Sequence, residues 1–192
     1  MSKNKIGIGF GTWAWGNKIV WGYKPETDDI LLKKTFFDAI NGGLDLVDTA
    51  DSYGTGRLFG QSEKLIGNFL EDFPKKKLKK ITIATKLAPF PWRIGRNGLN
   101  KAFEESNKRL KGNMKRVQLH WSTSRYAPWQ EEQLLNGLGD LYDSGLIEEI
   151  GLSNTGPKRL YFLYKKLKER GIKIKSIQMQ FSLLTKPSLV YE

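Results

Sequence analysis

Four residues of this chain have the side chains and the spacing of a catalytic set. Asp48, Lys86 and His120 each stand at the carboxyl end of a short apolar run, 38 and 34 residues apart, and Tyr53 follows Asp48 by five positions. In a (β/α)8 barrel the catalytic groups come from the carboxyl ends of successive strands and from the loops beyond them. If the apolar runs are strands of such a barrel, the four side chains converge at one end of it.

Together these side chains suit hydride transfer to a carbonyl carbon. Reduction of an aldehyde or ketone places negative charge on the carbonyl oxygen, which must then receive a proton. Tyr53 can donate that proton if the pKa of its phenol, about 10 in free solution, falls toward the working pH. We expect the Lys86 ammonium to lower that pKa, Asp48 to keep the amine charged, and His120 to hydrogen-bond the substrate oxygen. Taken singly, each residue reads as a strand cap, a surface ion pair or a core histidine, whereas the matched set favours a site.

The elements that must position these residues alternate regularly along the chain. Apolar residues at helical spacing, mostly ended by glycine, predict five helices, at 32–40, 65–69, 99–110, 134–142 and 157–170. Short apolar runs before, between and after them predict six strands, at 6–10, 44–48, 81–85, 116–120, 147–151 and 176–180. Strands that alternate with helices at this spacing indicate βαβ units and a parallel sheet.

Two parallel architectures are compatible with this alternation. The run Gly7-x-Gly9-x-Gly11 is similar to the fingerprint of a doubly wound dinucleotide-binding fold, but its third glycine comes one position early and no helical period follows it. The placement of ionisable residues at strand ends favours the (β/α)8 TIM-barrel type instead. A complete barrel needs eight strands, so we predict one α/β domain over residues 1–192 that is an incomplete barrel, with six strands and five helices.

The chain resembles the aldo-keto reductases, NADP-dependent (β/α)8 barrels, and is most similar to their cyanobacterial and plant branch. The resemblance rests on GLDLVDTADSYGTG at 43–56, followed in order by ATK at 84–86, LHW at 119–121 and GLSN at 151–154. It implies NADPH-dependent reduction of a small aldehyde or ketone to an alcohol. The family's catalytic Asp, Tyr, Lys and His fall on Asp48, Tyr53, Lys86 and His120.

The resemblance also implies a cofactor site and a substrate pocket. Ser153, Asn154 and Gln178 match the residues that hold the nicotinamide carboxamide, a group that needs both hydrogen-bond donors and acceptors. Gly11, Thr12 and Trp13 match the first loop, which borders the nicotinamide ribose and the substrate, and Trp13 and Trp121 are expected to line the substrate pocket. The family's clamp for the cofactor phosphates follows the last two barrel strands, which this sequence does not contain.

Composition and charge limit the other classes of function. The chain has 192 residues, a formal net charge of +12 and no Cys, so disulfides and thiolate chemistry are excluded, and we expect no metal site. No apolar run approaches the roughly 18 residues of a membrane span and no secretory signal begins the chain, so the expected location is the cytoplasm. The positive charge gathers at 72–80 and 158–175, which we interpret as solvated helix surface rather than a specific nucleic-acid site.

The incomplete barrel leaves two alternatives to an active reductase. One is a catalytically impaired barrel that acts as an interaction module or is a relic, and the other, more remote, is a nonspecific polyanion binder. An open sheet edge also predicts self-association or a partner chain that completes the barrel.

Overall fold

The computed structural model of the chain describes residues 7–56 and 59–184. These residues form two compact units, the first made of Met1–Thr85 and Ser106–Met114 and the second of Lys86–Glu105 and Lys115–Glu192, each within the described residues. The prediction of a single domain over 1–192 stays a prediction. The elements follow the chain in the order β1 (Gly9–Gly11), α1 (Lys18–Trp21), α2 (Pro25–Asn41), β2 (Leu46–Asp48), α3 (Gln61–Glu71), α4 (Lys75–Leu78), β3 (Thr82–Leu87), α5 (Gly95–Arg109), β4 (Arg116–Leu119), α6 (Pro128–Asp143), β5 (Glu149–Ser153), α7 (Pro157–Glu169) and β6 (Ile174–Gln178).

The strands are paired in the order in which they occur in the chain. The sheet runs β1-β2-β3-β4-β5-β6, and the strand pairs β1–β2, β2–β3, β4–β5 and β5–β6 are parallel. A doubly wound fold reverses its strand order at a switch point, and no such reversal occurs here. The fold is therefore α/β and of the (β/α)8 barrel type, with six of the eight strands among the described residues.

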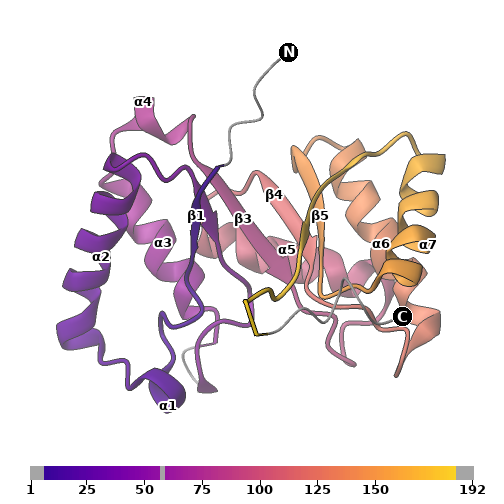
Figure 1. The fold of residues 1–192 in the computed structure, drawn as a ribbon, viewed down its shortest axis with the longest axis horizontal. Helices are drawn as coiled ribbons and strands as arrows, with labels where there is room; N and C mark the ends of the chain where they lie inside the picture. Colours follow the sequence, from indigo (N-terminus) through magenta and orange to yellow (C-terminus); the bar gives the residue numbers. More distant parts are fainter. Residues whose placement is uncertain (1–6, 57–58, 185–192) are drawn as a thin grey trace. The chain divides into compact units, whose positions relative to one another are not determined.

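In the first unit, α2 and α3 lie side by side next to β1 and β2 (Figure 1). Aromatic side chains join these helices to each other and to β1. Phe36 of α2 is completely buried, and its ring lies 5.8 Å from that of Phe69 on α3 and 6.1 Å from that of Phe10 on β1, centroid to centroid. Trp15 is also buried and contacts the same cluster, so it belongs to the core of this unit. Large aromatic rings in edge-to-face contact bury much apolar area and so hold the helices on the strands.

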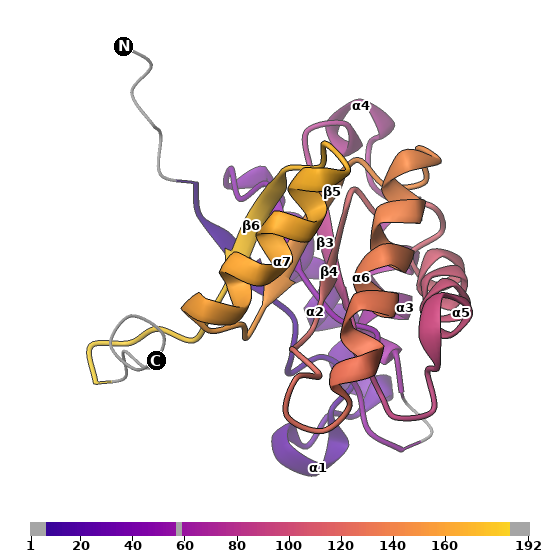
Figure 2. The same cartoon turned by 90° about the vertical axis from the view of Figure 1, so that its right-hand side faces the viewer.

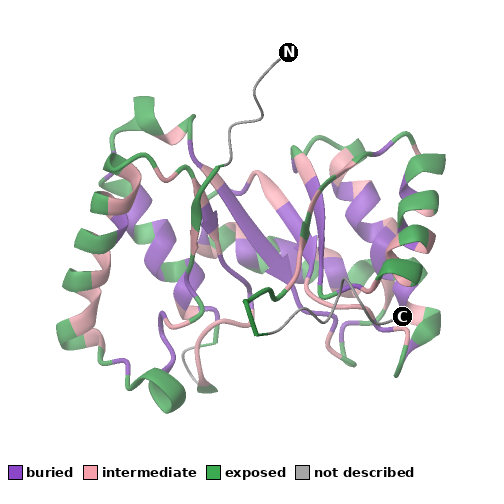
Figure 3. Cartoon of the chain, in the orientation of Figure 1, coloured by how far each residue is buried: buried purple, intermediate pink, exposed green. Residues whose placement is uncertain are grey.

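In the second unit, the apolar face of α6 packs on β4 and β5. Leu134, Leu135, Leu138 and Leu141 of this helix are buried, as are all residues of β4 and β5 except the first of each strand (Figure 3). Burial along nearly the whole length of a strand is typical of parallel sheets whose faces are covered. The core of this unit therefore lies between α6 and these two strands.

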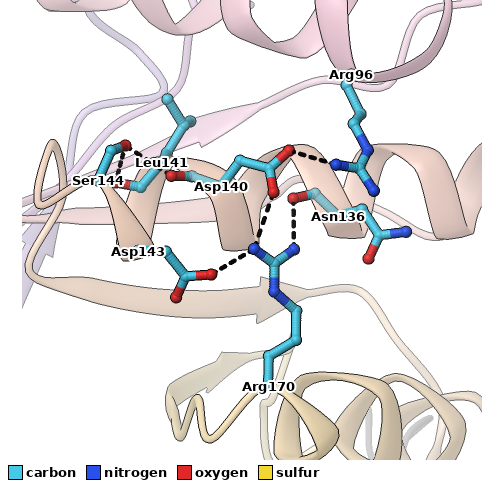
Figure 4. Close-up of polar contacts among 7 residues, drawn as sticks. All are labelled: Arg96, Asn136, Asp140, Leu141, Asp143, Ser144 and Arg170. Carbon is cyan, nitrogen blue, oxygen red and sulfur yellow. Dashed lines mark hydrogen bonds and ion pairs between the residues drawn. The ribbon is translucent and has the colours of Figure 1, made fainter.

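A network of charged groups joins three helices of the second unit. The Arg170 guanidinium, just after α7, donates to Asp140 Oδ1 at 2.8 Å and to Asp143 Oδ2 at 2.5 Å on α6 (Figure 4). It also donates to the carbonyl oxygen of Asn136, while Arg96 of α5 donates to the other oxygen of Asp140 at 2.8 Å. At least half of the basic residues between 158 and 175 pair with carboxylates in this way, because Arg159, Lys166 and Lys175 also form ion pairs.

The structure confirms the five long helices and corrects several element boundaries. The described residues contain seven helices, namely the five that were predicted and the one-turn helices α1 and α4, which were not. Asn17 begins α1 by accepting a hydrogen bond from the Val20 N–H, a local cap that leaves no apolar period in the sequence. The fifth strand begins two residues later than predicted, and the sixth begins two residues earlier. The first strand, β1, covers Gly9–Gly11, whereas the predicted strand began at residue 6, which lies outside the described residues.

Candidate active site

Asp48 is the last residue of β2 and lies next to the first loop. In the register of the sheet it is the partner of Gly11 on β1 and of Ala84 on β3. The backbone N–H and the hydroxyl of Thr12 both donate to the Asp48 carbonyl oxygen, each at 3.0 Å. Two of the first-loop residues predicted to contact the cofactor, Gly11 and Thr12, are thus attached to the predicted catalytic aspartate through its backbone.

A buried cluster of hydroxyl groups holds this loop to α3. The hydroxyl of Ser62 donates to Thr12 Oγ1 at 2.7 Å and lies 3.0 Å from the hydroxyl of Thr49, the residue after Asp48, and all three residues are fully buried. Buried hydroxyls are stable when each has a partner. The sequence analysis missed Ser62, since a serine in the first turn of a helix carries no signal of its own.

A second buried contact fixes the end of β3. Glu63 is fully buried, accepts a hydrogen bond from Thr85 Oγ1 at 2.5 Å and forms an ion pair with Arg109, Nε to Oε2 at 2.7 Å. Thr85 precedes Lys86 directly, so this pair anchors the strand that carries the predicted catalytic lysine. Buried charged groups are stabilised only when they are paired and hydrogen bonded.

Tyr53 lies half-buried in the turn after β2, where its N–H donates to the Ala50 carbonyl oxygen at 3.2 Å. Burial raises the pKa of its phenol above the ordinary value of 10, and the nearby Asp48 carboxylate raises it further. Burial and Asp48 thus act against the predicted fall of this pKa, and the lowering expected from Lys86 stays a prediction. The consequence is a phenol that keeps its proton at neutral pH.

Lys86 and His120 lie in the second unit. Lys86 is buried and sits within β3, one residue before its end, not after the strand as predicted. His120 follows β4, and its backbone N–H donates to the Leu87 carbonyl oxygen at 3.1 Å. Burial, together with the positive charge of Lys86, lowers the pKa of His120 to about 3. The imidazole is therefore neutral at pH 7 and can donate a hydrogen bond from one ring nitrogen.

The three residues predicted to bind the carboxamide are brought together beside His120. Ser153 ends β5 and Gln178 ends β6, where they are register partners, and the Ser153 hydroxyl donates to Gln178 Oε1 at 3.4 Å. Asn154 Nδ2 donates to Ser153 Oγ and to the His120 carbonyl oxygen, each at 3.1 Å. Asn154 has φ = 49°, in the left-handed region that asparagine adopts more readily than most residues and that recurs at functional sites.

Trp13 and Trp121, the two tryptophans predicted to line the substrate pocket, have different surroundings. Trp13 is 55% exposed and contacts Trp21 edge to face, with ring centroids 6.0 Å apart. The Trp121 ring lies 4.8 Å from that of His120, and its Nε1 donates to the Tyr126 hydroxyl at 2.9 Å. Tyr126 in turn donates to the Pro89 carbonyl oxygen, so it positions Trp121, a role that the sequence did not indicate.

The predicted site residues thus form two sets, one in each unit. Asp48, Tyr53 and the first loop belong to the first unit, and Lys86, His120, Trp121 and the carboxamide residues belong to the second. Among the described residues, no group of three or more His, Asp or Glu side chains is placed to hold a metal ion. In the same part of the chain, every helix is too short or too polar to cross a membrane.

The chain is similar in sequence to two curated reductases. It is 46% identical over 181 residues to the chloroplastic pyridoxal reductase of Arabidopsis thaliana, a match that covers 93% of this chain and 49% of the relative. It is 31% identical over 157 residues to the aldo-keto reductase YhdN of Bacillus subtilis, covering 77% of this chain and 43% of the relative. The chain therefore spans about half the length of these curated relatives.

Solved structures have the same fold. The thermostable aldo-keto reductase Tm1743, crystallised with the inhibitor epalrestat, superposes with a TM-score of 0.71 at 25% identity, over 90% of this chain and 57% of Tm1743. An aldo-keto reductase from Klebsiella pneumoniae in complex with NADPH superposes with a TM-score of 0.64 at 23% identity, over 82% of this chain and 48% of that protein. Residues 7–192 match the family model described as "Aldo/keto reductase family", and the chain accordingly belongs to the aldo-keto reductases.

Proposed function

We propose that this chain carries the proton-transfer and nicotinamide-binding residues of an NADP(H)-dependent reductase that converts an aldehyde or ketone to an alcohol. The observation that carries this proposal is the cluster of Ser153, Asn154 and Gln178 beside His120. A hydroxyl and two side-chain amides offer the donors and acceptors that a carboxamide needs, so these residues fit the nicotinamide. NADPH, when bound, supplies the hydride that attacks the carbonyl carbon.

In this proposal Tyr53 protonates the developing alkoxide. The raised pKa of its phenol keeps the proton in place until negative charge appears on the substrate oxygen. Lys86 carries the positive charge that stabilises the phenolate left behind, and Asp48 orients Lys86. The low pKa of His120 supports its role as a neutral hydrogen-bond donor that directs the carbonyl oxygen, since a neutral imidazole donates without giving up its proton.

The substrate class follows from this chemistry and from the relatives. The reaction requires a carbonyl that can approach Tyr53 and His120. The Arabidopsis relative is named a pyridoxal reductase and is 46% identical to this chain, so we propose pyridoxal, an aromatic aldehyde, as the first substrate to test. In the first loop, the exposed ring of Trp13 is available to contact such a ring, and Trp121 is held beside His120 by Tyr126.

The test separates proton transfer from cofactor binding. NADPH oxidation in the presence of pyridoxal is followed by absorbance, and NADPH binding by fluorescence. We expect Tyr53→Phe to lower kcat by about 100-fold or more, as loss of a general acid does, while the Kd for NADPH changes little. Gln178→Leu is expected to raise that Kd about tenfold, the effect of about 1.4 kcal/mol of lost hydrogen bonding. Tyr142→Phe, a tyrosine on α6 outside both site sets, is the matched control and should change neither value.

The polyanion alternative has less support, because Arg159, Lys166, Arg170 and Lys175 pair with carboxylates of the chain itself. A DNA titration at rising salt tests it, since a polyanion binder loses affinity steeply as salt increases. The cytoplasm remains the predicted location, and imaging of a fluorescent fusion tests it.

A further inference from the structure

A cavity of about 310 Å³ opens in the first unit beside the short helix α4. Its lining combines exposed polar side chains with aliphatic side chains that are partly or fully buried. The lining residues are mainly Asn41, Asp45, Lys77 and Lys80, together with Leu44 and Ile81. A cavity of this size with an apolar part and a few polar groups is typical of a site for a small molecule.

The cavity lies at the end of this unit that is opposite to Tyr53. Asp45 directly precedes β2 and Ile81 directly precedes β3, so both stand at the amino ends of these parallel strands, whereas Asp48 ends β2. Figure 2 accordingly shows α4 and α1 at opposite ends of the unit. The first residue of α1 donates its N–H to Thr55 Oγ1 at 3.0 Å, in the loop that carries Tyr53. The cavity is therefore separate from the candidate active site.

A single turn places two lysines at the cavity. The Lys80 N–H donates to the Lys77 carbonyl oxygen at 3.0 Å, and residues three apart in such a turn lie on the same side of it. The Thr82 N–H donates to the Asp45 carbonyl oxygen at 2.7 Å, which joins this turn to the one before β2. Lys77 also reaches the end of α2, where its Nζ donates to Asn41 Oδ1 at 2.8 Å. The turn with the two lysines is thus attached to the other walls of the cavity.

The positive charge at the cavity is not neutralised by the carboxylates nearest to it in the sequence. Glu71 and Asp72, which precede α4, form ion pairs with lysines outside this helix. Among the described residues, no carboxylate pairs with Lys77 or Lys80, and Lys77 is bonded to the neutral amide of Asn41. Two ammonium groups are therefore available to an anion, with which they would form charge-assisted hydrogen bonds.

The other lining groups limit the kind of anion. Asp45 contributes a carboxylate, and α2 ends at Asn41 with the negative end of its dipole, so a hydrogen-bond donor or a cation is favoured there. Leu44 and Ile81 contribute aliphatic surface, which suits a short hydrocarbon chain. A phosphate monoester carries a charge of about −1.5 to −2 at pH 7, so it matches two lysines better than a carboxylate does.

We propose that this cavity binds a small phosphate monoester whose short aliphatic body carries an amino or hydroxyl group. The phosphate oxygens accept hydrogen bonds from Lys77 and Lys80, and the amino or hydroxyl group donates to Asp45. The aliphatic body lies against Leu44 and Ile81. This second site does not depend on the proposed reaction.

The experiment titrates the full 192-residue chain with phosphoethanolamine and follows the amide shifts in ¹H–¹⁵N NMR spectra. We expect saturable shifts that are confined to the residues around the cavity. Lys77→Gln combined with Lys80→Gln should raise the Kd about tenfold or more, because both charge-assisted hydrogen bonds are lost. The matched control, Lys75→Gln combined with Lys76→Gln, removes the same charge from the same helix but from residues that do not line the cavity. At about 0.15 M salt, which screens distant charges, it should change the Kd by less than about twofold.

Two further ligands test the separate parts of the proposed site. Ethyl phosphate lacks the amino group, so Asp45→Asn should weaken the binding of phosphoethanolamine several-fold without weakening that of ethyl phosphate. Equal effects on the two ligands would refute the role of Asp45. Glycerophosphoethanolamine is a diester with one negative charge and should bind more weakly than the monoester. Tighter binding of the diester would overturn the proposal in favour of a lipid headgroup.

Two results of the titration would refute the site itself. One is the absence of saturable shifts below about 10 mM phosphoethanolamine. The other is an equal effect of the two lysine pairs, which would show a diffuse basic surface instead of a built site. These readouts involve no catalysis, so they can fail or succeed independently of the reductase assay.

Discussion

The buried ion pair between Glu63 and Arg109 should make a large contribution to the stability of the first unit. Glu63 on α3 has no solvent-exposed surface, and the side chain of Arg109 is 13% exposed. Arg109→Met retains most of the aliphatic packing but leaves the Glu63 carboxylate buried without its cation. Removing one partner of a buried pair costs about 3–5 kcal/mol, because the remaining charge is not compensated. We therefore expect the free energy of unfolding to fall by about this amount.

A nearby surface pair provides the control for this experiment. Lys111 pairs with Glu71, whose side chain is 61% exposed, and an exposed pair is worth about 1 kcal/mol or less. Urea unfolding at pH 7, followed by circular dichroism, should separate Arg109→Met from Lys111→Met by at least about 2 kcal/mol. Replacing both partners, with Glu63→Gln added to Arg109→Met, should recover part of the loss. Equal effects of the two single substitutions would refute the reasoning from burial.

Three further predictions test individual contacts. A Cβ at Gly67 would lie 2.0 Å from the Arg109 carbonyl oxygen, so Gly67→Ala should lower the free energy of unfolding by about 1–3 kcal/mol, and an unchanged urea midpoint would contradict this close approach. The folded-state pKa of His120, about 3, lies below its unfolded value of about 6.5, so its contribution to stability is complete above about pH 6.5 and is lost as the pH falls toward 3. His120→Gln should therefore lose less stability than the parent chain between pH 6.5 and 5, and parallel pH profiles would contradict this. Arg170→Met should lower the melting temperature more than Lys34→Met, because Arg170 bonds two aspartates and a carbonyl, whereas Lys34 and Asp38 form an exposed pair.

Much of the fold could be predicted from the sequence because its periodic signals are strong. The leucines of α6 repeat at helical spacing, and Gly145 and Gly171 follow α6 and α7 with positive φ, as glycines after helices commonly do. The predicted strands were correctly ordered and paired in parallel. The boundaries of β5 and β6 were less accurate, since pairing between the strands, rather than local composition, decides where each begins.

Within the candidate site, the sequence predicted only the residues whose side-chain type and motif match the expected chemistry. Ser153, Asn154 and Gln178, singled out by family resemblance, are joined by hydrogen bonds. The supports of the site were missed, because Ser62 and Glu63 look like any polar first turn of a helix until the fold buries them. The effect of burial on the pKa of Tyr53 was also missed, since desolvation depends on burial that the sequence does not display.

The most direct test of the proposed reaction follows the transferred hydrogen. NADPH deuterated at both C4 positions of the dihydronicotinamide is mixed with pyridoxal and the chain, and the alcohol is analysed by mass spectrometry. The proposal predicts an alcohol that carries deuterium on the former carbonyl carbon, with its formation slowed about 100-fold or more in Tyr53→Phe. An alcohol without deuterium, no alcohol, or equal rates for the chain and Tyr53→Phe would contradict it.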